Sequence, residues 1–141
     1  MKNFLITLIF FFAVSGYVYA QSTLALQEKC AEGAKQFFFD RINLYGGKLG
    51  NFVDEKGRGY NHYASHYNER LDKCLVQIDY YYYPKDMQKV LYSIEVLDVF
   101  EETTYGSFFS GFYPSVICDV GNKKCNSLVE FKALIKPYME E

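Results

Sequence analysis

The chain has 141 residues, with 15 basic and 17 acidic side chains and a formal net charge of −2 at pH 7. This balance argues against nucleic acid or an anionic membrane surface as a partner, because both favour a basic patch. The length suits one domain rather than two.

Residues 1–20 read as a secretory signal peptide. Lys2 supplies the positive charge, residues 4–14 form an apolar run broken only by Thr7, and Val18 and Ala20 are the small residues of a cleavage site. The apolar run is shorter than the roughly 20 residues of a membrane anchor. We therefore expect a secreted or periplasmic protein, with residues 21–141 as a single domain and no stable membrane insertion after cleavage.

All four cysteines lie in the exported part, and an even number in an oxidising compartment predicts two disulfides. Their spacing does not match a zinc site. The pair Gly121-Asn122 is a two-residue hairpin signal, and symmetry about it places Cys118 opposite Cys125. The remaining bridge then joins Cys30 to Cys74.

A helix is expected from Leu24 to about Asn43, because apolar residues recur there at helical spacing (Leu26, Cys30, Ala34, Phe37 and Phe38). Residues 43–61 carry five glycines and no sustained period, which predicts a glycine-rich loop. The Gly57-Arg58-Gly59 stretch lacks the Gly-Lys-Ser/Thr ending of a phosphate-binding loop.

Residues 60–73 contain both histidines and leave two conformations open. In a helix, His62 and His66 would share a face and could share a metal ion. In an extended chain they would lie about 13 Å apart and could not. Since no His-Glu-x-x-His pattern is present, we expect two structural, hydrogen-bonded histidines, no metal and no cofactor.

Strands are expected at residues 74–83, 89–100, 103–112 and 115–120, where β-branched and aromatic residues dominate. Ser127 and Glu130 then form the capping box of a final helix, which Pro137 is expected to end. The predicted fold is α+β: an N-terminal helix, an antiparallel sheet of four to five strands, a C-terminal helix and two disulfides.

The first of these strands has two different faces. Cys74, Val76 and Ile78 share a core face with Tyr80 and Tyr82, because strand side chains alternate. The other face is half-exposed and rich in tyrosine. We predict a binding surface there, which also includes the motif His66-Tyr67-Asn68 that precedes the strand in sequence. The candidate residues are His66, Tyr67, Asn68, Tyr81 and Tyr83.

Several short motifs occur together: His66-Tyr67-Asn68-x-x-Leu71-x-Lys73-Cys74, Asp98-x-Phe100-Glu101 with Tyr105-Gly106, and Glu130-Phe131-x-x-Leu134-x-x-Pro137-Tyr138-Met139. With the Cys118–Cys125 pair, this set resembles a group of small secreted bacterial proteins that have no assigned function. The resemblance covers most of residues 21–141. It implies a bacterial exported domain and supplies neither an activity nor catalytic residues.

Aromatic content favours a binding role. Twelve tyrosines and nine phenylalanines lie in residues 21–141, and tyrosine offers a large contact area with one polar tip. We expect a non-enzymatic binding or inhibitory module for a protein, peptide or glycan. The alternatives are a structural or envelope-associated protein and a histidine-dependent hydrolase, although no Gly-x-Ser-x-Gly motif is present.

Overall fold

The computed structural model describes residues 23–43, 49–87, 89–111 and 116–140. The signal peptide predicted for residues 1–20 lies outside these ranges. No helix among the described residues is long and apolar enough to cross a membrane.

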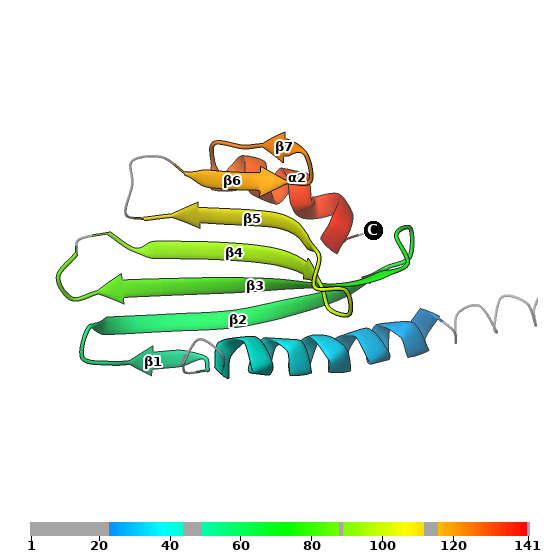
Figure 1. The fold of residues 1–141 in the computed structure, drawn as a ribbon, viewed down its shortest axis with the longest axis horizontal. Helices are drawn as coiled ribbons and strands as arrows, with labels where there is room; N and C mark the ends of the chain where they lie inside the picture. Colours follow the sequence, from blue (N-terminus) through cyan, green and yellow to red (C-terminus); the bar gives the residue numbers. More distant parts are fainter. Residues whose placement is uncertain (1–22, 44–48, 88, 112–115, 141) are drawn as a thin grey trace, which may run out of the picture.

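A seven-stranded antiparallel sheet forms the body of the protein (Figure 1). Each strand pairs with its neighbour in the sequence, so the sheet is a meander from one edge to the other. The strands are β1 (Asn51–Val53), β2 (Gly57–Asn68), β3 (Lys73–Pro84), β4 (Leu91–Asp98), β5 (Thr104–Ser110), β6 (Ile117–Val120) and β7 (Lys123–Lys124). The α+β class is confirmed, whereas the expectation of four to five strands was too low.

The largest correction concerns the glycine-rich loop expected at residues 43–61, because β1 and the start of β2 lie within it. Gly57 and Gly59 lie in β2, at positions where the neighbouring residues leave no space for a side chain. A Cβ on Gly59 would lie 2.1 Å from the ring of Phe52, and one on Gly57 would lie 2.4 Å from the carbonyl oxygen of Tyr83. These glycines allow close packing in a strand.

The N-terminal helix (residues 23–43) runs beside β1 and β2 (Figure 1). Of the apolar stripe predicted from the helical spacing, Cys30, Ala34 and Phe38 are buried, whereas Leu26 near the start of the helix is 40% exposed. Ile42, one turn beyond Phe38, is also buried. The stripe packs on one face of the sheet to form the first core, whose strand residues are Cys74, Val76, Ile78, Leu97 and Val99.

The C-terminal helix α2 (Leu128–Met139) packs on the opposite face. Its buried Phe131 and Ile135 form a second core with strand residues that include Ile94, Val96, Phe108 and Val120. Ile94 pairs across the strands with Asp79, whereas Ile78 of the first core pairs with Glu95. Because cross-strand partners share a face, the two cores lie on opposite sides of the sheet.

The ends of α2 match the sequence at one terminus only. Ser127 is the N-cap, and its hydroxyl accepts a hydrogen bond from the backbone N–H of Glu130. The expectation that Pro137 ends the helix was wrong, since α2 continues to Met139. Proline removes one donor from the last turn, but the N–H of Glu140 still donates to the carbonyl of Lys136.

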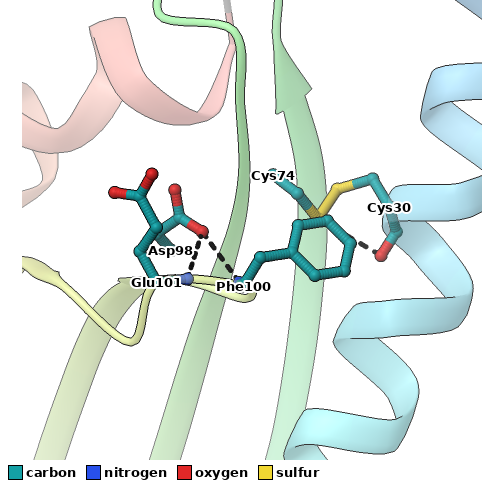
Figure 2. Close-up of a disulfide and its surroundings, with 5 residues drawn as sticks. All are labelled: Cys30, Cys74, Asp98, Phe100 and Glu101. Carbon is teal, nitrogen blue, oxygen red and sulfur yellow. Dashed lines mark hydrogen bonds between the residues drawn. A yellow bond between two sulfur atoms is a disulfide. The ribbon is translucent and has the colours of Figure 1, made fainter.

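Both predicted disulfides are present in the structure. Cys118 and Cys125 face each other across the β6–β7 hairpin with Cα atoms 5.0 Å apart. Cys30 and Cys74 join the N-terminal helix to β3, with Cα atoms 5.2 Å apart (Figure 2). Figure 2 also draws Phe100, whose ring centroid lies 5.8 Å from Nζ of Lys29 on the same helix as Cys30. The helix is therefore linked to the sheet both covalently and through the first core.

A candidate binding groove on the sheet

The five candidate residues fall into two separate groups. Tyr81 and Tyr83 lie near the end of β3, whereas His66, Tyr67 and Asn68 lie at the far end of β2. His66 pairs with Leu75, which is six residues from Tyr81 along β3. At about 3.4 Å per residue the two groups are roughly 20 Å apart, so they do not form one site.

Asn68 has a structural role in this fold. Its side chain is fully buried, and its amide donates hydrogen bonds to the backbone carbonyls of Pro137 at 2.9 Å and Tyr138 at 3.1 Å. Its side-chain oxygen accepts from the N–H of Leu71 at 3.0 Å. Tyr67 packs against the first core and donates its hydroxyl to Asp72. Both side chains support the fold rather than the candidate site.

Tyr81 and Tyr83 line an open groove of about 680 Å³ over β1, β2 and β3. It lies on the face that carries α2, but no residue of either described helix lines it. The lining residues are Asn51, Phe52, Val53, Arg58, Gly59, Tyr60, His62, Tyr81 and Tyr83. We call this feature the tyrosine groove. Its volume falls within the roughly 300–1,000 Å³ typical of small-molecule sites.

Strand register organises the groove into cross-strand rows. In the central row, Asn51 pairs with Tyr60, Tyr60 with Tyr81, and Tyr81 with Tyr92. The ring centroids of Tyr60 and Tyr81 are 6.3 Å apart, and those of Tyr81 and Tyr92 stack at 4.1 Å. A row of tyrosine rings therefore crosses three strands, and its two outer rings, Tyr60 and Tyr81, line the groove.

Tyr81 and Tyr83 differ in burial. Tyr83 is 40% exposed, whereas Tyr81 is half-buried and also packs against the second core. Tyr83 is therefore exposed to solvent, as expected for this face, whereas Tyr81 is partly covered by the second core. Leu75 and Asp79, on the same face of β3, are buried. This face of β3 is therefore exposed to solvent only toward Tyr83.

A buried carboxylate lies next to the groove. Asp79 is 5% exposed, and one of its oxygens is 2.9 Å from Nε2 of His62. It also accepts hydrogen bonds from the amide of Gln77 at 3.1 Å and the hydroxyl of Tyr92 at 3.4 Å. Burial raises the pKa of Tyr92, and its neighbours Tyr81 and Asp79 raise this pKa further. The phenol therefore stays protonated and acts as a donor to Asp79.

The geometry around His62 does not favour acid–base catalysis. A general base needs a ring nitrogen within reach of the substrate. Nε2 of His62 is engaged by Asp79, and Nδ1 is enclosed without a hydrogen-bond partner. All four cysteines are in disulfides, so none offers a thiolate nucleophile. Neither the His62–Asp79 pair nor the cysteines support the alternative of a histidine-dependent hydrolase.

The two histidines lie in one continuous strand, β2. An extended chain separates His62 from His66 by about 13 Å, which is too far for both to bind one ion. In the described ranges, no three His, Cys, Asp or Glu side chains converge as metal ligands.

Arg58 gives the groove its charge. The residue is exposed, and its guanidinium carbon lies 5.1 Å from the centroid of the Tyr83 ring. Within the part of the chain that the structure describes, Arg58 makes no ion pair with a carboxylate. None of the described residues that line the groove is an Asp or Glu. The groove is therefore locally cationic on a chain of net charge −2.

Six of the described residues that line the groove lie in the segment 43–61, for which the glycines predicted a loop: Asn51, Phe52, Val53, Arg58, Gly59 and Tyr60. A usable signal was present. Residues 57–62 alternate small or polar residues with large ones, with Arg58, Tyr60 and His62 on one side. Such alternation is the mark of a strand.

Comparison with protein-family models, with curated proteins and with solved structures finds no match to this chain. Its function must therefore be inferred from the geometry of the groove.

Proposed function

We propose that the protein is an exported, non-enzymatic binding module, secreted or periplasmic, whose ligand site is the tyrosine groove. The observation that carries this proposal is an open groove with Tyr60 and Tyr83 at its surface, 37% and 40% exposed, on a sheet face that α2 covers elsewhere. Exposed aromatic side chains that gather in a concave site are typical of ligand recognition.

The groove is also well placed to keep its shape. Its floor consists of paired strands, and the Tyr81–Tyr92 stack and the Asp79 hydrogen bonds fix the side chains beneath it. A site on a rigid sheet loses little conformational entropy when a ligand binds. Two disulfides suit an exported domain that meets its ligand in an oxidising compartment.

The proposal can be tested by two-dimensional NMR of the ¹⁵N-labelled, disulfide-bonded exported chain. The chain is titrated with a library of oligosaccharides, peptides and small organic acids. We expect ligands to shift the amide signals of β1, of the start of β2 and of the end of β3 together. Tyr83→Ala should weaken binding by about tenfold or more, as expected of an aromatic anchor.

Ile117→Ala is the matched control, because Ile117 is 54% exposed in β6, outside the groove. Its affinity for the same ligands should equal that of the wild type. Shifts confined to the α2–β7 side, or equal losses in both variants, would contradict the groove as the site.

The alternative is a structural or envelope-associated role without a ligand. In that case the library produces no saturable shifts in the groove, and Tyr83→Ala retains the localisation and the cellular phenotype of the wild type. Loss of the phenotype in Tyr83→Ala, with folding intact, would instead support the binding role.

A further inference from the structure

We propose that the ligand of the tyrosine groove is a saccharide that carries a carboxylate, and that Arg58 binds this carboxylate. This inference rests on the proposed function and specifies its ligand. The position of Arg58, the charge of the groove and the chemistry of its lining support it.

Arg58 is held in a position that suits a planar anion. It pairs across the strands with Tyr83, and its guanidinium lies over the Tyr83 ring. A cation–π contact of this kind uses none of the guanidinium N–H groups as hydrogen-bond donors to the ring's hydroxyl, so they stay able to donate to a ligand. Those N–H groups match the two oxygens of a carboxylate in a bidentate pair.

The charges around Arg58 favour an anion. Two acidic residues closely precede Arg58 in the sequence. Glu55 is not among the described residues that line the groove. Asp54 accepts hydrogen bonds from the N–H groups of Lys56 and Gly57 and from the hydroxyl of Tyr82, whose side chain is on the other face of β3. Asp79 is buried under His62 and Tyr92 and does not line the groove. A bound carboxylate would therefore meet a cation, with no competing acid among the described lining residues.

The rest of the lining suits a sugar. Tyr60, Tyr81 and Tyr83 present aromatic rings with hydroxyl tips, and Asn51 adds an amide. Saccharides combine apolar C–H faces, which meet the negative face of an aromatic ring, with hydroxyls that exchange hydrogen bonds with tyrosine and amide groups. The groove's volume of about 680 Å³ suits a short oligosaccharide rather than a protein surface.

A peptide is less favoured by the same geometry. Peptides that bind along a sheet add a strand to an edge with free backbone groups. The edge strand beside the groove, β1, is only three residues long, from Asn51 to Val53. Such a short edge offers few backbone hydrogen bonds to an added strand.

Isothermal titration calorimetry can test the inference with a panel of acidic oligosaccharides, including oligogalacturonates and uronic-acid-containing disaccharides. Each is paired with its methyl ester, which keeps the sugar and removes the charge. We expect at least one acidic member to bind, and its ester to bind about tenfold more weakly or worse. Arg58→Gln should lose about tenfold in affinity for the acid, as esterification does, and almost none for the ester.

Lys132→Gln is the control, because Lys132 is an exposed cation on α2 away from the groove. It should bind the acidic sugar as the wild type does. Arg58→Lys should recover only part of the lost affinity, because a lysine ammonium cannot form the bidentate pair. Circular dichroism checks that each variant is folded.

The outcomes separate this inference from the proposed function. Equal binding of acid and ester, an unchanged affinity in Arg58→Gln, or Tyr83-dependent binding of peptides instead of sugars would overturn the acidic saccharide and leave the groove as a binding site. No binding of any acidic saccharide overturns the inference as well. If no compound of any class binds in the groove, both the inference and the proposed function fail.

Discussion

The amide of Asn68 donates a 2.9 Å hydrogen bond to the backbone carbonyl of Pro137, which lies 69 residues further along the chain. The last carbonyls of a helix have no partner within the helix. Asn68 supplies a donor to two of them, at Pro137 and Tyr138, from the end of β2. One buried side chain thus joins the end of α2 to the sheet.

Replacing this side chain should be costly. Asn68→Ala removes three hydrogen bonds from a fully buried position, so we expect a loss of about 2–3 kcal/mol in the free energy of unfolding. Urea unfolding followed by circular dichroism measures it. Asn43→Ala, at an exposed position of the N-terminal helix, should change stability by less than about 0.5 kcal/mol. Equal effects of the two substitutions would refute the role of Asn68.

Gly59 and Phe52 form a second test, because a Cβ at Gly59 would lie 2.1 Å from the Phe52 ring. Gly59→Ala alone should cost about 1–3 kcal/mol through overpacking. In Phe52→Ala/Gly59→Ala the clash is absent, so the double variant should lose less than the two single variants together. A double-mutant cycle in urea measures the difference. Simple additivity would show that the ring does not require glycine.

Tyr81 and Tyr83 should separate in stability even though both line the groove. Tyr81 stacks on Tyr92 at 4.1 Å and packs against the second core, so Tyr81→Ala should cost about 2 kcal/mol. Tyr83 is 40% exposed and contacts Arg58, so Tyr83→Ala should cost less than about 1 kcal/mol. Thermal melts of both variants check this order. A larger loss in Tyr83→Ala would mean that the groove is covered.

The buried phenol of Tyr92 predicts a pH dependence of stability. Burial raises the pKa of Tyr92 above the value of about 10 found in an unfolded chain. A raised pKa means that the folded state holds the proton more tightly. Its contribution is therefore complete below about pH 10 and is lost progressively as the pH rises further.

Urea midpoints measured from pH 8 to 11.5 should therefore fall above about pH 10. Tyr92→Phe cannot ionise, so its midpoint should fall less steeply than that of the wild type over the same range. Identical slopes for the two proteins would contradict the assignment of this effect to Tyr92.

The two disulfides should contribute unequally. The Cys30–Cys74 bridge spans 44 residues and the Cys118–Cys125 bridge spans seven. On a chain-entropy basis they stabilise the folded state by about 4 and about 2.5 kcal/mol. Cys30→Ala/Cys74→Ala should thus lower the urea midpoint more than Cys118→Ala/Cys125→Ala does. The reverse order would show that the long bridge stabilises less than its span suggests.

Local pattern predicted the parts of the fold that rest on side-chain period and turn chemistry. The apolar stripe from Cys30 to Phe38, the alternation from Cys74 to Ile78 and the hairpin at Gly121 all led to elements that the structure contains. Both cysteine pairings followed from the position of that hairpin, and they are confirmed. These features depend on neighbours in the sequence.

The errors arose where distant residues decide the conformation. Glycines at 57 and 59 signal a loop until Phe52 and Tyr82 are known to pack directly on them. Asn68 belonged to a promising motif, and only its hydrogen bonds to α2 reveal its structural role. Six of the nine described residues that line the tyrosine groove were missed for the same reason, since they lie in the segment 43–61 that was assigned to a loop.

The meander order of the strands also has a kinetic consequence. Because each strand pairs with the one beside it in sequence, contact order is low for a sheet of this size, and proteins with local contacts fold faster. The groove rests on β1, β2 and β3, which are consecutive. We expect these three strands to pair early, before β5 to β7 have docked, so that the ligand site takes shape on the first half of the sheet to be synthesised.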